Sequence, residues 1–257
     1  MAHWYEGPLA AFDTETTGVD VETDRIVSAA LVLQTGPAEP ARTLHWLADP
    51  GVPIPEAARA VHGISDAEVR AHGRPPHAVV DEVARALADL AGAGVPLVVM
   101  NAPYDLTLLD RELERHRGRS LADHLGDGAP LLVLDPRVLD KHVDRYRKGR
   151  RTLTDLCVHY GVVLGAAHDA AADALASLQV VREIGRRHPG TLGSLSPGEL
   201  HPRQAVWHAA QARGLQAWFE RSGTPERVDT AWPLRPRRCG CGRRLQPGRV
   251  HSCEAAA

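Results

Sequence analysis

The sequence predicts a mixed α/β domain whose sheet carries an antiparallel group of strands at one edge. Two observations indicate this class. Three strand-like segments open the chain with no helical pattern between them, and the later segments alternate between short apolar strands and amphipathic helices.

The three opening strands are expected at residues 8–15, 25–34 and 42–48. The middle segment is almost wholly aliphatic, and Gly36 and Pro37 supply a turn after it. Because short turns join antiparallel neighbours, these strands are predicted to form a meander.

Helical periodicity appears after the meander. Pro76 and Gly92 mark the start and end of the clearest helix. The expected helices cover residues 76–91, 104–116, 152–160 and 169–187, and buried strands are expected at 97–100 and 131–134.

The chain is predicted to have three parts. Residues 1–190 form the main domain. Residues 191–232 form a helical extension, joined by a linker rich in Gly, Ser and Pro and docked through Trp207, Trp218 and Phe219. Residues 233–257 form a small tail rich in Arg and Cys.

Composition excludes several classes. A hydrophobic content of 44% supports a packed core, and a net charge of −2 argues against a strongly basic nucleic-acid coat. No stretch is apolar enough to span a membrane, and the N-terminus lacks the pattern of a signal peptide. With four cysteines among 257 residues, the protein is expected in the cytoplasm, with no membrane partner.

Acidic residues mark the ends of two predicted strands. Asp13 and Glu15 are two residues apart on a strand, so both side chains point to one face. Their mutual repulsion would be relieved by a bound cation, although an ordinary polar strand end is the alternative. Asp105 follows a buried strand and opens a helix, where an acid could equally complement the helix dipole.

A histidine and two more acids lie at the start of the last helix of the main domain. Asp169 is placed to cap this helix, whereas Asp173 lies one turn further in and is expected to face inward. Four carboxylates and the imidazole of His168 are the groups that a two-metal phosphodiester hydrolase requires.

Three ordered motifs carry a family resemblance. Asp13-Thr-Glu15-Thr-Thr-Gly18, Asn101-Ala-Pro-Tyr-Asp105 and His168-x4-Asp173 resemble the DEDDh 3′–5′ exonucleases, the family of the epsilon proofreading subunit of bacterial DNA polymerase III. The resemblance spans about residues 8–187 and implies a ribonuclease-H-like fold. Tyr104 departs from the family's usual Phe and adds a hydroxyl that needs a partner.

The resemblance also implies roles. Asp13, Glu15 and Asp173 would bind one metal ion, Asp13 and Asp105 would serve a second, and His168 would be the general base. The ions would be Mg²⁺ or Mn²⁺. The terminal nucleotide would lie along Thr16, Thr17 and His62, and Asn101 would organise the nearby strand-to-helix corner.

The predicted activity is hydrolysis of the terminal phosphodiester of a free 3′ end, with single-stranded DNA favoured, in replication proofreading or repair. A DNA polymerase is a candidate partner. Two alternatives remain: an exonuclease for RNA ends or oligoribonucleotides, and a non-catalytic protein that binds nucleic-acid ends or a polymerase.

Two basic segments stay open to more than one interpretation. The run from Lys141 to Arg151 is either a solvated loop or part of the path of the single strand. In the tail, Cys239, Cys241, His251 and Cys253 could bind a structural zinc, but the Cys-x-Cys spacing is unusual for zinc and a reduced tail is the alternative.

Overall fold

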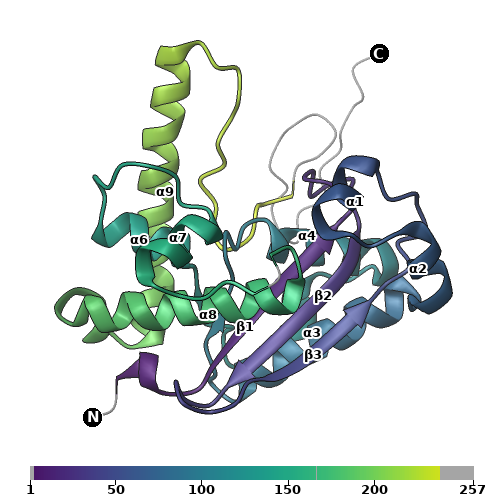
Figure 1. Cartoon of the computed structure of the whole chain (residues 1–257), viewed down its shortest axis with the longest axis horizontal. Helices are drawn as coiled ribbons and strands as arrows, with labels where there is room; N and C mark the ends of the chain where they lie inside the picture. Colours follow the sequence, from purple (N-terminus) through teal and green to yellow (C-terminus); the bar gives the residue numbers. More distant parts are fainter. Residues whose placement is uncertain (1–2, 166, 238–257) are drawn as a thin grey trace.

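The fold is built on one mixed β-sheet (Figure 1). The structure is a computed structural model and describes residues 3–165 and 167–237. In these residues five strands pair in the order β3-β2-β1-β4-β5. They are β1 (Leu9–Thr16), β2 (Ile26–Gln34), β3 (Arg42–Leu47), β4 (Leu97–Val98) and β5 (Val133–Leu134).

The strand directions confirm the predicted sheet. β1 pairs with β2, and β2 with β3, in antiparallel register. β1 pairs with β4, and β4 with β5, in parallel. The opening meander therefore forms one edge, and the two short parallel strands complete the other side.

The predicted helices are present, with small changes at their ends. They correspond to α3 (Pro76–Gly92), α4 (Asp105–Arg117), α7 (Leu153–Tyr160), α8 (Ala170–Arg187) and α9 (Pro197–Ser222). Four short helices were not predicted: α1 (Glu56–His62), α2 (Asp66–His72), α5 (Leu121–Leu125) and α6 (Pro136–Val143). Two single turns, at Trp4–Glu6 and Pro189–Gly193, complete the set of described helices. The second lies where a linker was predicted, and Leu192 there is fully buried.

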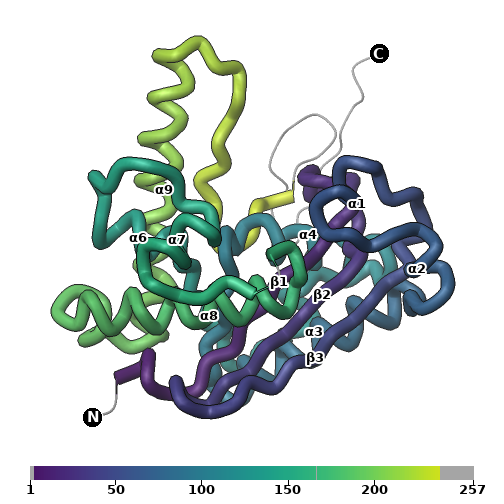
Figure 2. Tube along the Cα trace, in the orientation of Figure 1, coloured from purple at the N-terminus to yellow at the C-terminus, as the bar shows by residue number. Residues whose placement is uncertain are grey.

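Helices cover both faces of the sheet (Figures 1 and 2). Along β1, Ala10 and Phe12 belong to the core beneath α3 and α4, whereas Leu9 and Ala11 belong to the core beneath α8. Side chains alternate along a strand, so residues 13 and 15 continue the face that α8 covers. Because of this alternation, the side chains of residues 13 and 15 face helix α8 and not α3 or α4.

Helix α9 closes the open edge of the sheet. The buried amide of Gln204 accepts a hydrogen bond from the backbone N–H of Asp135 at 2.7 Å and donates one to the carbonyl of Val133 at 2.9 Å. Nδ1 of His201 accepts from the N–H of Val133 at 3.0 Å. Side chains of α9 therefore satisfy edge groups of β5 that would otherwise invite another strand.

Beyond this edge α9 projects away from the body, and the chain after Ser222 returns alongside it (Figure 2). Trp207 packs against both cores, as predicted. The predicted docking of Trp218 is wrong, because its residue is 54% exposed on the projecting half of the helix. The returning segment is fixed by the buried Trp232 and by a hydrogen bond from the N–H of Arg235 to the hydroxyl of Thr107.

Among the residues that the structure describes, no helix combines the length and apolar composition that crossing a bilayer requires.

Candidate active site

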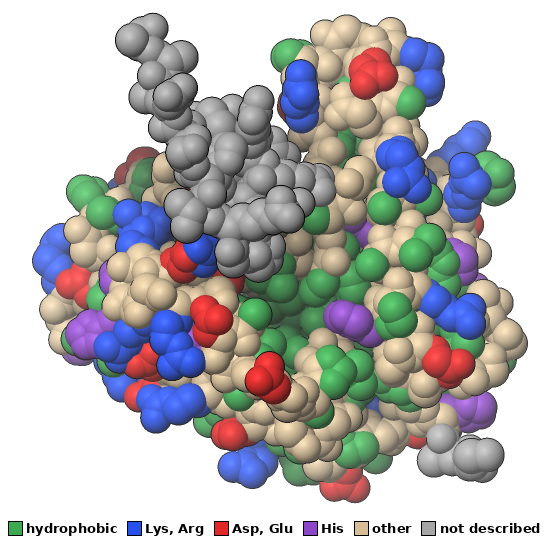
Figure 3. All heavy atoms as spheres, turned by 180° about the vertical axis from the view of Figure 1, so that it is seen from behind, with side chains coloured by type: hydrophobic (Ala, Val, Ile, Leu, Met, Phe, Trp, Pro, Cys, Tyr) green, Lys and Arg blue, Asp and Glu red, His purple; other side chains and the backbone are tan. Residues whose placement is uncertain are grey.

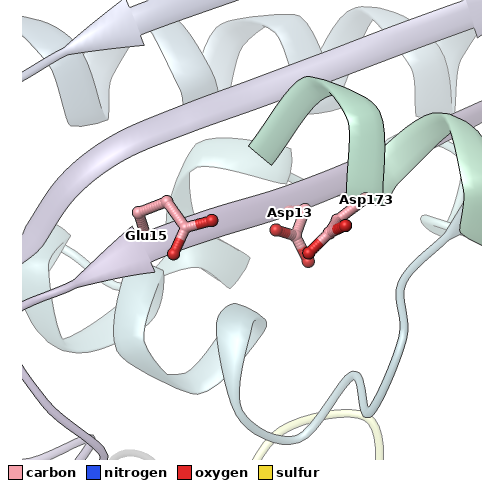
Figure 4. Close-up of side chains that lie close together, drawn as sticks. All are labelled: Asp13, Glu15 and Asp173. Carbon is pink, nitrogen blue, oxygen red and sulfur yellow. The ribbon is translucent and has the colours of Figure 1, made fainter. Parts of the chain in front are cut away.

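Three carboxylates converge where β1 meets α8 (Figure 4). Ligand oxygens of Asp13, Glu15 and Asp173 all lie within 4.8 Å of one another. β1 presents the first two on the face that α8 covers. The carboxylate of Asp169 accepts the N–H groups of Ala171 and Ala172, each at 3.0 Å, and so caps α8 one turn before Asp173. The predicted separation of a capping acid from an inward-facing acid is confirmed.

In the part of the chain that the structure describes, no Lys or Arg forms an ion pair with any of the three carboxylates. Burial, followed by repulsion from Asp105 and Asp173, raises the pKa of Asp13 well above its usual range. Burial and repulsion from Asp173 raise the pKa of Glu15 to about 8, and burial raises the pKa of Asp173. Oδ1 of Asp173 is buried and accepts no hydrogen bond from the described residues. Hard, crowded oxygens with an unpaired buried atom fit a divalent cation such as Mg²⁺ or Mn²⁺.

Asp105 lies beside this trio without being one of its three members. It is the first residue of α4 and is buried. Thr14, on the opposite face of β1 from Asp13, donates a hydrogen bond from its hydroxyl to Oδ1 of Asp105 at 2.6 Å. Burial raises the pKa of Asp105 to about 7, and the Thr14 hydrogen bond opposes that rise.

His168 occupies the loop immediately before the cap of α8. Its backbone has a φ of 65°, and its residue is exposed. Its backbone N–H donates to Oδ2 of Asp173 at 3.3 Å. The main chain of the predicted general base is thus tied directly to one of the three converging carboxylates.

The residues predicted to line the terminal nucleotide lie near one another. His62 ends α1; its Nδ1 accepts the N–H of Ile64 at 3.1 Å, and its Nε2 is buried with no partner in the described residues. Thr16 bonds the carbonyl of Gly18 at 2.7 Å. The hydroxyl of Thr17 donates to Asp24 at 2.7 Å, and its backbone N–H donates to the carbonyl of Arg25. The contacts of Thr16, Thr17 and His62 with a substrate stay predictions.

Asn101 shapes the corner that leads to Asp105. It has a left-handed φ of 60°, which Asn tolerates better than most residues. Two groups that were not predicted hold this corner. Asp135 accepts the N–H groups of Asn101 and Ala102, and the guanidinium of Arg137 donates to Oδ1 of Asn101 at 3.0 Å.

The sequence does contain a signal for Asp135. An acid directly after an apolar strand and directly before Pro136 is typical of a helix cap followed by proline at the first helical position. In the structure Asp135 caps α6 by accepting the N–H of Arg137 at 2.9 Å.

The four tail residues predicted as zinc ligands, Cys239, Cys241, His251 and Cys253, lie outside the described residues. The prediction of zinc there stays untested.

The chain belongs to an exonuclease family. Residues 10–181, more than half of the chain, match the RNase_T family, described as Exonuclease. The resemblance to this exonuclease family and the ribonuclease-H-like fold are thereby confirmed, and the family is one that generally depends on divalent metals.

Individual relatives agree with this assignment. Over 106 residues the chain is 40% identical to a DNA polymerase III subunit epsilon-like protein of Rhodobacter capsulatus, a match that covers 40% of this chain and 14% of the relative. Exonuclease I of Methylocaldum szegediense shares the fold with a TM-score of 0.59 and 18% identity, over 72% of this chain and 41% of that one.

Exonuclease I of E. coli, solved in complex with a dT13 oligonucleotide, matches with a TM-score of 0.56 and 18% identity, over 72% of this chain and 42% of that one. The chain therefore spans less than half the length of the solved structures described above and a smaller part of the epsilon-like relative.

Proposed function

We propose that the protein is a metal-dependent 3′–5′ exonuclease that removes nucleoside 5′-monophosphates from single-stranded DNA. The observation that carries the proposal is the convergence of Asp13, Glu15 and Asp173 within 4.8 Å, next to Asp105 and His168. Distant segments of the chain supply these groups, so their meeting is a property of the fold.

In this proposal the side chains divide into those that hold cations and those that orient the substrate. Asp13, Glu15 and Asp173 hold one divalent cation, and Asp105, with Asp13, serves a second. When bound, the cations supply an activated water and neutralise the charge that develops on the reacting phosphate. Thr16, Thr17, His62 and Asn101 orient the terminal nucleotide.

His168 accepts the proton of the attacking water. As the water oxygen bonds to phosphorus, the imidazole accepts the water's proton, and the bond from phosphorus to the 3′ oxygen of the preceding nucleotide breaks. That oxygen takes a proton from solvent and becomes the new 3′ hydroxyl. The exposed position of His168 allows it to return its proton to solvent between cycles.

DNA is favoured over RNA because of the relatives. The epsilon-like relative takes its name from a DNA polymerase subunit, and E. coli exonuclease I has been solved with deoxyribonucleotide oligomers. The same relative supports a place in replication proofreading or repair, with a polymerase as partner.

The direct test is digestion of single-stranded DNA labelled at either end, beside RNA of matched sequence, with MgCl₂ or MnCl₂. Loss of a 3′ label as mononucleotide, with a ladder from the 5′ label, is expected. Asp13→Asn should abolish it, while Asp127→Asn, in an exposed loop, should not.

Shortening from the 5′ end, or no digestion of any polynucleotide with either cation, would contradict the proposal. Faster digestion of the RNA than of the DNA would indicate that the substrate is an RNA end.

A further inference from the structure

A second feature of the molecule is a groove between α6 and α9. Its cavity measures about 600 Å³. The lining includes four cations, Arg137, Lys141, Arg145 and Arg151, and the aromatic residues Tyr146, Trp207 and Trp218, with no Asp or Glu among the described residues. The whole α9 wall lies beyond residue 181, where the family match ends. Seen from behind, Lys and Arg side chains also stand out around the projecting part of α9 (Figure 3).

Among the described residues, only one of the four lining cations, Arg151, is neutralised by an ion pair, with Asp140. Arg137, Lys141 and Arg145 form no ion pair with any described residue. Burial, followed by repulsion from Arg151, lowers the pKa of Lys141. A partner that brings negative charge would remove this repulsion.

The basic run is also better ordered than a solvated loop would be. Arg147 and Arg151 both donate to Oδ2 of the fully buried Asp140, at 2.7 and 2.6 Å, and the hydroxyl of Tyr160 donates to Oδ1 at 2.9 Å. These two arginines anchor the loop, and Arg145 and Tyr146 are left on its outer side.

Exposed aromatic rings lie beside the cations, and the guanidinium of Arg145 lies over one face of the Tyr146 ring, 5.6 Å from its centroid. Trp218 is 54% exposed and Tyr146 86% exposed, which is unusual for side chains of this size. The ring of Trp207 is already stacked on His142, with centroids 3.6 Å apart, so that face cannot stack on a base. Exposed rings that alternate with unpaired cations are the elements from which single-strand binding surfaces are made.

The groove is connected to the candidate active site through Arg137. This side chain lines the groove and donates to Asn101, at the corner that places Asp105. A strand whose 3′ end lies at the carboxylates can therefore pass Arg137 and continue toward Lys141 and Trp218.

We propose that this groove binds the single-stranded nucleic acid upstream of the nucleotide being removed, with phosphates on Lys141 and Arg145 and bases stacked on Trp218 and Tyr146. This inference rests on the proposed exonuclease function and extends it: the C-terminal extension would add a strand-holding surface to the family domain.

The test separates binding from chemistry. In an Asp13→Asn background, we would measure the affinity of Trp218→Ala and Arg145→Ala for a single-stranded oligonucleotide of about 20 nucleotides and one of about 4 nucleotides, across salt concentrations. Each variant should weaken binding of the long strand by roughly tenfold and leave the short strand unchanged. Arg145→Ala should also lower the slope of log affinity against log salt by about 0.7.

Matched variants control for folding and general charge. Arg213→Ala removes an exposed cation from the same helix outside the groove and should leave both affinities unchanged. Trp218→Phe keeps an aromatic face and should retain most of the binding. With Asp13 restored, Trp218→Ala should digest the short strand at the normal rate and the long strand less processively.

The proposed role of the groove would be overturned if Trp218→Ala and Arg145→Ala bound the long strand as tightly as the parent does, even if the parent digests DNA normally. Loss of affinity for poly-glutamate alone would assign the groove to an acidic protein segment instead. Failure of the parent to digest any polynucleotide is a separate result, which would overturn the exonuclease function itself.

Discussion

The hydroxyl of Tyr104 lies 2.7 Å from Oγ1 of Thr16, and it also donates to the carbonyl of Gly18. These bonds join the corner before α4 to the turn after β1, so the segments that carry Asp105 and Glu15 are held together. Burial raises the pKa of Tyr104 to about 12, so the group stays protonated and able to donate.

Removing this hydroxyl should loosen the link. We expect Tyr104→Phe to lower the free energy of unfolding by about 1 kcal/mol, the value of a typical buried hydrogen bond. Urea denaturation measures the change. Tyr146→Phe, at an exposed ring, is the control and should have no effect. Equal stability of the two variants would show that the Tyr104 hydroxyl contributes nothing.

The hydrogen bond from Thr14 lowers the pKa of the Asp105 carboxyl group. This hydrogen bond favours the charged form, so Thr14→Val should raise the pKa of Asp105 further above about 7. If ionised Asp105 is required, the acid limb of the pH–rate profile should move to higher pH. Thr43→Val, on the exposed strand β3, should leave the profile in place. A shift toward lower pH would contradict this role.

The carboxylate cluster should make stability depend on pH and on cations. The pKa values of Glu15 and Asp105, about 8 and about 7, exceed the unfolded values of about 4. The folded protein therefore binds these protons more tightly, and the resulting stabilisation is present below about pH 4 and is lost as the pH rises toward 8.

A cation that binds the ionised carboxylates should reverse this loss. We expect MnCl₂ to raise the melting temperature more at about pH 8 than at about pH 5. Differential scanning fluorimetry with Asp13→Asn as a comparison measures the effect, and that variant should respond weakly at both pH values. An equal response of the two proteins would remove Asp13 from the cation site.

His168 is predicted to act on the proton and not on affinity. His168→Gln should lower the rate of digestion by roughly 10²–10⁴-fold while the affinity for single-stranded DNA stays constant. The pH–rate profile should also flatten on its acid side. His159→Gln, at another exposed histidine, is the control. A wild-type rate for His168→Gln would exclude it as general base.

The contact of α9 with β5 should be important for stability. Gln204→Ala leaves the N–H of Asp135 and the carbonyl of Val133 without these partners in a buried place. We expect a loss of about 2 kcal/mol or more in the free energy of unfolding. Arg203→Ala, its exposed neighbour, should change stability little, and a similar small loss for Gln204→Ala would show that water replaces the amide.

Local patterns in the sequence were sufficient for the sheet and for much of the site. The two-residue spacing of Asp13 and Glu15 determines their shared face, and the cap at Asp169 determines which acid of its helix turns inward. Both relationships act over a few residues, so they can be worked out before the fold is known.

Longer-range relationships could not be predicted in this way. Asp135, at the N-cap of α6, supports Asn101 from 34 residues further along the chain, and Arg147 and Arg151 meet Asp140 only after the loop folds back. The exposure of Trp218 depends on how far α9 extends past the body, which an apolar side chain alone does not reveal.

The way α9 covers β5 has a practical consequence for anyone who trims this protein to its family boundary. A fragment ending near residue 181 would lack Gln204 and His201. The backbone groups of Val133 in β5 would then lose these hydrogen-bond partners. Such a fragment should pair with copies of itself and precipitate, so poor behaviour of a shortened clone would say nothing about the competence of the catalytic groups.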